Sequence, residues 1–177
     1  WTSGYYVALA AAVWWTRARW RQVASAVACV LLAVIVSAPF VSWSRPARGW
    51  MRVSVLDVGQ GDAILVQTPN GRALLVDAGG TPAGTYDIGG RVVTPAVWAL
   101  GERRVEWLVV SHGDLDHVGG AARVMEDLSP REIWEGIPVE SSAVLQDLRR
   151  KAQARHVTWR RVLAGHDLEA GGVHIVV

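Results

Sequence analysis

The 177-residue sequence predicts an α/β protein in two pieces, an N-terminal transmembrane helix segment followed by a truncated α/β domain. First, residues 23–41 form a run of 19 residues without a charge. Second, after residue 50 short β-type apolar runs alternate with helical patterns, which favours a sheet with helices packed on it. Third, residues 1–50 hold five arginines and no acid, whereas residues 51–177 hold 13 basic and 16 acidic side chains. The overall net charge of +2 therefore describes neither piece and is no evidence for nucleic-acid binding.

Residues 1–41 are interpreted as transmembrane helices, the first of them partial. The charge-free run at 23–41 would measure about 28 Å as a helix, close to a hydrocarbon core of about 30 Å. A signal peptide and a buried soluble helix are the alternatives, but the run is long for the first and too uniformly apolar for the second. Arg17, Arg19 and Arg21 precede it, and the positive-inside rule places them in the cytoplasm and the following chain outside. The equally basic flank at 45–52 argues against this orientation.

A linker rich in Pro, Gly and Ser spans residues 42–50, and the pattern then changes to strands. Alternating and apolar runs at 51–58, 63–68 and 72–80 predict three short strands. The Pro-Asn-Gly sequence at 69–71 is a strong hairpin turn between the second and third. These strands predict a meander that opens the α/β domain.

The rest of the domain alternates helices and strands. Residues 92–100 predict a helix, and the almost continuously apolar residues 105–111 predict a strand covered on both faces. A polar, glycine-punctuated loop follows at 112–120. Further helices are expected at 121–128 and 141–156, and further strands at 132–134, 157–161 and 173–177. The last strand reaches the end of the chain without a closing element, so the domain at 51–177 is expected to be incomplete at its C-terminus.

The sequence Ser-His-Gly-Asp-Leu-Asp-His at 111–117 carries the chemistry. Two imidazoles and two carboxylates crowded at a strand end are costly unless a cation offsets the charge. Both groups are ligands of divalent metals, and the spacing allows one pair of His112 with Asp114 and another of Asp116 with His117. Two metal ions about 3.5–4 Å apart would follow. A solvated acidic turn with incidental histidines is the plainer alternative.

This loop resembles the H-x-H-x-D-H signature of the metallo-β-lactamase superfamily. Together with LDVGQGDA at 56–63, LLVDAGG at 74–80 and SHGDLDHVGG at 111–120, it is similar to the ComEC family of competence DNA-uptake membrane proteins. The resemblance implies that residues 51–177 form the first half of a metallo-β-lactamase-like αββα sandwich. It also implies a bacterial inner or plasma membrane protein of several spans, with the domain on the periplasmic or extracellular side.

By the same resemblance, His112 and Asp114 would bind one metal, and Asp116 and His117 the second. Asp116 would also face the nucleophilic water, which makes it the catalytic candidate. Asp114 stands where the superfamily usually has a second histidine, and this harder ligand shifts the preference away from zinc. The expected cofactors are two divalent ions, Mn or Zn, with Mg as a further candidate.

Three other aspartates flank these motifs. Asp77, at the end of the third strand, matches the carboxylate that orients the metal loop from behind its ligands. Asp57 and Asp62 bracket a glycine turn, where hydrogen bonding within the turn and contact with substrate are equally plausible roles. The later ligands of the superfamily are expected beyond residue 177, because the remaining histidines (His156, His166 and His174) lie in no recognisable motif.

The resemblance implies part of a DNA internalisation channel whose soluble domain is a metal-dependent hydrolase, a nuclease that degrades the strand not imported. Its partners would be DNA, single-stranded in particular, the membrane and other competence DNA-uptake proteins. The alternatives are a membrane-tethered hydrolase of RNA, a lactone or a thioester, and a non-catalytic structural domain of the channel. The 177-residue chain itself is expected to be inactive. A basic cluster at 149–161 is interpreted as a solvated helix face, with a DNA-facing patch as the alternative.

Overall fold

The computed structural model describes residues 2–14, 18–37, 45–81 and 86–177. The chain divides into two compact units, Trp1–Trp43 and Ser44–Val177. The boundary between the units lies within the predicted linker at 42–50.

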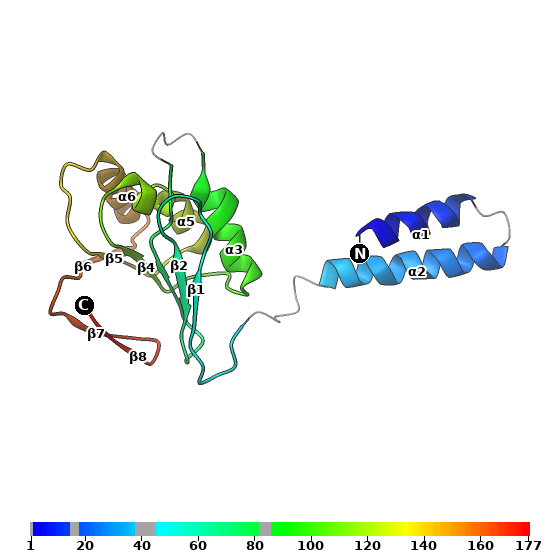
Figure 1. Cartoon of the computed structure of the whole chain (residues 1–177), viewed down its shortest axis with the longest axis horizontal. Coiled ribbons are helices and arrows are strands. Elements are labelled where there is room, and N and C mark those ends of the chain that lie inside the picture. The colour runs from blue at the N-terminus through cyan, green and yellow to red at the C-terminus, as the bar shows by residue number, and fades with distance from the viewer. Residues whose placement is uncertain (1, 15–17, 38–44, 82–85) are drawn as a thin grey trace. The chain divides into compact units, whose positions relative to one another are not determined.

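The first unit contains two helices, α1 (Thr2–Trp14) and α2 (Ala18–Ser37), which pack against each other (Figure 1). Among the described residues, no helix is both long enough and apolar enough to cross a membrane. The predicted transmembrane segment is therefore unsupported. α2 begins before the charge-free run and includes Arg19 and Arg21, while residues 38–41 of that run lie outside the described residues.

The second unit is built on a six-stranded mixed sheet (Figure 1). Its strands are paired in chain order: β1 (Arg52–Val55), β2 (Ile64–Gln67), β3 (Ala73–Val76), β4 (Trp107–Val110), β5 (Glu132–Glu135) and β6 (Thr158–Arg161). The first three strands are antiparallel, as the predicted meander requires, and β3 through β6 run parallel. The α/β class is confirmed.

Helices cover one face of this sheet, and a hairpin packs on the other (Figure 1). The helical segments are η2 (Gly89–Val93), α3 (Thr94–Ala99), α4 (Leu115–Val118), α5 (Ala121–Leu128) and α6 (Ala143–Ala154), and the hairpin is β7 (Asp167–Ala170) with β8 (Val173–Val176). The predicted helix at 92–100 therefore begins earlier, in a π-helical turn. α4 lies inside the predicted loop, and β7 was not predicted.

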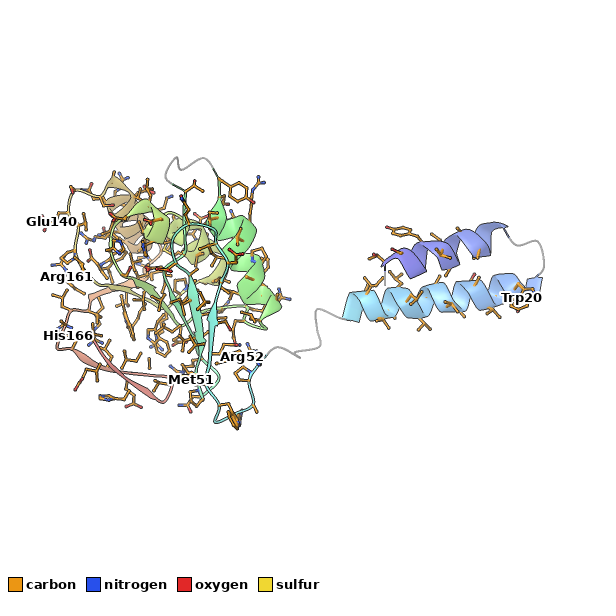
Figure 2. The ribbon with its side chains drawn as sticks, in the orientation of Figure 1. Trp20, Met51, Arg52, Glu140, Arg161 and His166 are labelled. Atoms are coloured by element: carbon orange, nitrogen blue, oxygen red, sulfur yellow. The ribbon has the colours of Figure 1, made fainter. Side chains whose placement is uncertain are left out.

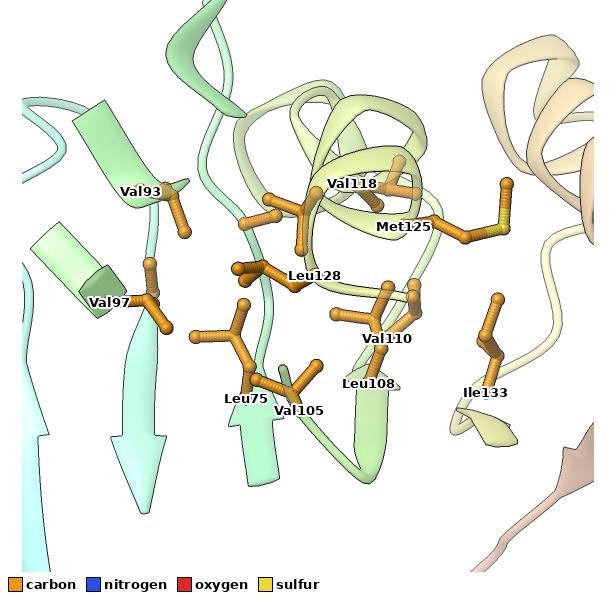
Figure 3. Close-up of a cluster of buried hydrophobic side chains, with 14 of the residues drawn as sticks. Leu75, Val93, Val97, Val105, Leu108, Val110, Val118, Met125, Leu128 and Ile133 are labelled. Atoms are coloured by element: carbon orange, nitrogen blue, oxygen red, sulfur yellow. The ribbon is translucent and has the colours of Figure 1, made fainter. Parts of the chain in front are cut away.

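The main core lies between the sheet and the helices. Leu75 and Leu108 point from adjacent strands toward Met125 and Leu128 of α5, and all four side chains are buried (Figure 3). Their chain neighbours face the opposite side, where Trp107 packs in a smaller cluster with the hairpin. Two-sided burial explains why the predicted strand at 105–111 reads as almost continuously apolar. This rigid base fixes the loop that follows β4.

Candidate functional site

The His/Asp loop at 111–117 leaves the carboxyl end of β4, next to the end of the parallel strand β3. The Asp77 N–H donates to the Val109 carbonyl of β4 at 2.8 Å, which joins the two strands. The Ala78 N–H donates to the His117 carbonyl of α4 at 2.9 Å. The carboxyl ends of neighbouring parallel strands thus bring Asp77 beneath the loop. α4 then turns the second half of the loop back toward the carboxyl ends of β3 and β4.

Asp77 is buried, with 2% of its surface exposed, and accepts three hydrogen bonds. Its Oδ1 accepts from the Ser111 backbone N–H at 2.8 Å. Its Oδ2 accepts from the Ser111 hydroxyl at 2.6 Å and from His117 Nδ1 at 2.9 Å. Asp77 has a φ of 57°, a left-handed conformation that Asp tolerates better than most residues. Asp77 therefore contacts both Ser111 and His117 from beneath the loop, and its role in orienting metal ligands stays a prediction.

The same network fixes the tautomers of both histidines. His112 Nδ1 lies 2.9 Å from the Ser111 hydroxyl oxygen. Because that hydroxyl gives its single proton to Asp77, His112 Nδ1 must be the donor in this contact. His117 Nδ1 donates directly to Asp77. Both Nε2 atoms therefore carry a free lone pair in the neutral rings, and the ring centroids are 4.1 Å apart.

Each Nε2 has a carboxylate beside it. His112 Nε2 lies 3.3 Å from Asp114 Oδ2, and His117 Nε2 lies 3.8 Å from Asp116 Oδ2. These are the two pairs that the sequence spacing predicts. Within the part of the chain that the structure describes, no group of three or more His, Cys, Asp or Glu side chains is arranged to hold a metal ion. The donor chemistry fits a divalent cation, with two donors in each pair.

The carboxylates around His117 change its proton affinity. Burial alone lowers the pKa of His117, but the hydrogen bond and the charge of Asp77 raise it. The charges of Asp116 and Asp62 add to this, so the pKa lies above its ordinary value of 6.5. A proton on Nε2 occupies the position in which a cation would be held.

The glycine turn at 59–61 packs against this loop. The Asp57 carboxylate accepts from the backbone N–H two residues later at 3.2 Å, which accounts for it as a turn residue. Asp62 Oδ2 lies 3.9 Å from His117 Nδ1, so this side chain borders the site. A Cβ on Gly61, whose φ is 81°, would overlap the backbone carbonyl of Asp116. The close approach explains the need for glycine at this position.

Two serines that the sequence did not single out hold the loop in place. Ser111 links Asp77 to His112, as described above. Ser142 caps α6 by accepting from the Leu145 N–H at 3.3 Å and donates to the Gly113 carbonyl at 2.7 Å. A serine directly before the first histidine is a signal that could have been used, whereas Ser142 is brought in only by the fold.

The remaining histidines lie elsewhere in the unit. His156 lies two residues after the end of α6. His166 lies in the turn before β7 (Figure 2). His174 is on β8, 3.9 Å from Asp167. Each of them therefore stays outside the cluster around Asp77.

The basic cluster at 149–161 is largely ion-paired. Arg149 binds both oxygens of the buried Glu135 at 2.7 and 2.9 Å, and Arg161 lies 3.6 Å from the same group. Arg150 and Lys151 pair with Asp147 on the helix surface. These contacts favour the solvated helix face over a DNA-facing patch.

The His/Asp loop at the carboxyl end of a parallel strand lies where open α/β sheets bind ligands, and its imidazole and carboxylate groups are donors for divalent metals. The Metallo-beta-lactamase superfamily profile matches residues 56–172, which is more than half of the chain. The chain therefore belongs to the metallo-β-lactamase superfamily. That membership suggests a metal-dependent hydrolase.

Two curated proteins are similar to the chain. It is 42% identical over 90 residues to "Competence protein ComA" of Neisseria gonorrhoeae, which covers 50% of this chain and 12% of that protein. It is 32% identical over 80 residues to "ComE operon protein 3" of Bacillus subtilis (strain 168), covering 39% of this chain and 10% of that protein. Both matches agree with the resemblance to the ComEC family. The chain spans about a tenth of the length of either relative.

Proposed function

We propose that the whole protein is a metal-dependent hydrolase that cleaves DNA during competence-type DNA uptake. The observation that carries this proposal is the network in which one buried carboxylate leaves the Nε2 atoms of His112 and His117 free on neighbouring rings. Free imidazole nitrogens paired with carboxylates are donors for divalent metals. When bound, a pair of such ions supplies Lewis acidity for activating water and stabilising an anionic oxygen.

The proposed division of work follows the two pairs. His112 and Asp114 would hold one ion, and Asp116 and His117 the other. Asp116, about half exposed, would also orient the attacking water and accept its proton. Asp77 keeps both rings in the metal-binding tautomer through Ser111 and His117 Nδ1. Mn or Zn is the proposed metal, with Mg as a third candidate.

DNA is proposed as the substrate because one relative is named a competence protein, and because the motifs of this chain resemble the ComEC family of DNA-uptake proteins. Single-stranded DNA, a membrane and other competence proteins are the proposed partners. A structural domain without catalysis is the second candidate, favoured by the lack of a three-ligand group among the described residues.

The test is an assay of the full gene product with single- and double-stranded DNA in Mn, Mg or Zn. Cleavage that needs metal and is lost in Asp116→Ala supports the proposal. Turnover of RNA, a lactone or a thioester in place of DNA would identify another hydrolase. No metal-dependent turnover of any of these substrates would leave the structural role.

The protein is further proposed to lie at the bacterial inner or plasma membrane, with this domain on the periplasmic or extracellular side. The support is the apolar surface of α2, where Val23, Val30 and Val36 are each more than half exposed. Water alone is an unfavourable environment for such a surface. Protease treatment of spheroplasts tests the location, since an outward domain would be digested and an inward one protected.

A further inference from the structure

A cavity lies at the opposite end of the parallel strands from the His/Asp loop. It is a cavity of about 610 Å³ at the amino ends of β3, β4 and β5. Its lining contains five arginines: Arg45, Arg72, Arg103, Arg104 and Arg131. Only two acids share it, Glu102 and Glu106, so the formal charge of the lining is +3.

Both acids are already engaged, which leaves the excess positive charge unneutralised. Glu102 is buried and accepts hydrogen bonds from Arg45 and from Gln67, each at 2.9 Å. Glu106 is shared between Arg72 at 3.3 Å and Arg131 at 3.4 Å. One carboxylate facing two guanidinium groups at these distances leaves donors on both free for another anion.

The two remaining arginines have no acid of their own. Arg103 lies over the ring of Trp98, at 5.6 Å from the centroid, which fixes the side chain without neutralising it. Arg104 forms no ion pair with any residue in the described part of the chain. The Arg131 and Arg72 side chains are 75% and 51% exposed, so a ligand in the cavity can reach them.

This positive charge is confined to the amino ends of the parallel strands. Residues 44–177 carry 15 basic and 16 acidic side chains, a net charge of −1, and five of the aspartates lie at the other end of the strands: Asp57, Asp62, Asp77, Asp114 and Asp116. The two ends are separated by the length of these four-residue strands, about 13 Å at about 3.3 Å per residue. The arginine cavity attracts a polyanion that approaches the domain. The aspartates around the His/Asp loop repel it until cations bind there.

We propose that this arginine cavity binds the phosphodiester backbone of a DNA strand. Guanidinium groups pair with phosphate oxygens through two parallel hydrogen bonds, and several of them spaced along a groove track successive phosphates. The cavity therefore holds DNA independently of the His/Asp loop. The proposal rests on the proposed function only for the identity of the polyanion.

The test is the binding of a fluorescent single-stranded oligonucleotide to the full 177-residue chain, by anisotropy, in EDTA and a mild non-ionic detergent. EDTA removes any need for hydrolysis, so failure of this proposal and failure of the proposed hydrolase are distinguishable. The triple variant Arg72→Gln, Arg104→Gln and Arg131→Gln keeps much of each side chain and removes three charges. The slope of log affinity against log salt should fall by about 2 in magnitude, and the affinity at low salt should drop about tenfold or more.

The matched control removes three charges from the surfaces of α5 and α6, through Arg123→Gln, Arg150→Gln and Arg155→Gln. It should bind nearly as tightly as the unaltered chain. Arg104→Gln alone breaks no ion pair and should lower the slope by about 0.7 while leaving the melting temperature unchanged. Equal losses in the triple variant and the control would overturn the proposal. So would an unchanged oligonucleotide affinity in the triple variant, even if its binding to phosphatidylglycerol vesicles were lost.

Discussion

Replacing Asp77 by Asn should weaken metal binding at the loop, because it reverses the hydrogen bonds that set both histidine tautomers. Asn preserves the shape of the side chain and also tolerates the left-handed φ of 57° at this position. Its amide oxygen can still accept from the Ser111 N–H, as Asp77 Oδ1 does at 2.8 Å. Its NH₂ group, however, takes the place of Oδ2, which accepts at 2.6 Å from the Ser111 hydroxyl and at 2.9 Å from His117 Nδ1.

The substitution changes where the imidazole protons lie. An NH₂ group donates, so His117 Nδ1 must become an acceptor and its proton moves to Nε2. The Ser111 hydroxyl is then free to donate to His112 Nδ1, which moves that proton to Nε2 as well. Both Nε2 lone pairs are lost to metal binding. Loss of such orienting contacts typically costs 10–100-fold in affinity, about 1.4–2.7 kcal/mol, and two affected rings favour the upper end.

Calorimetric titration of the 177-residue chain with Mn²⁺ and with Zn²⁺ is the assay. Asp62→Asn is the matched control, because it makes the same chemical change on a side chain that is 59% exposed and 3.9 Å from His117. The control should change affinity by less than about threefold, as expected for a screened charge. An Asp77→Asn variant that remains folded and binds metal as tightly as the unaltered chain would refute the tautomer argument.

Three further predictions concern the same domain. Gly61→Ala should destabilise the unit by about 1–3 kcal/mol in urea unfolding, because the new methyl group meets the Asp116 carbonyl and the φ of 81° disfavours alanine. Gly59→Ala separates the clash from the effect of φ and should cost less, because a Cβ there meets nothing within 4 Å. In the metal-free chain, the raised pKa of His117 predicts a contribution to the free energy of unfolding that is fully present below pH 6.5 and lost as the pH rises through the folded-state pKa. The stability of a His117→Gln variant should lack this pH dependence, and a variant with the same pH profile as the unaltered chain would contradict the prediction. Leu108→Ala should cost about 2–5 kcal/mol, since its side chain is fully buried in the main core; a loss below about 1 kcal/mol would show that this packing is wrong.

Local sequence patterns were sufficient for the α/β class, whereas the metal-binding role of the pairs within the loop stays a prediction. The turn at residues 69–71 predicts the β2–β3 hairpin, and the apolar run at 105–111 predicts β4, because each signal is contained in a few neighbouring residues. The pairing of His112 with Asp114 follows in the same way from spacing. Asp77 was identified by its place at a strand end, and its contact with His117 arises because β3 and β4 are parallel neighbours.

Features assembled from distant segments could not be predicted in this way. Ser142 reaches Gly113 only because α6 packs beside the loop. The hairpin strand β7 has the sequence Asp-Leu-Glu-Ala, whose alternating burial is too short to stand out from a polar connection. The arginine cavity draws on three strand beginnings that are up to 59 residues apart, from Arg72 to Arg131, whereas the basic run at 149–161 proved to be ion-paired.

His112 and His117 are expected to present Nε2 to a metal, because the Ser111 hydroxyl accepts the Nδ1 proton of His112 and Asp77 accepts that of His117. Nitrogen-15 NMR of both imidazole rings in the 177-residue chain, followed as zinc is added, tests it directly. The structure predicts Nδ1–H tautomers in the neutral metal-free chain at high pH and zinc-dependent shifts at both Nε2 atoms, with Nδ1 still protonated. Nε2–H tautomers before zinc is added, or zinc binding through Nδ1, would show that the contacts of Asp77 and Ser111 do not set these tautomers.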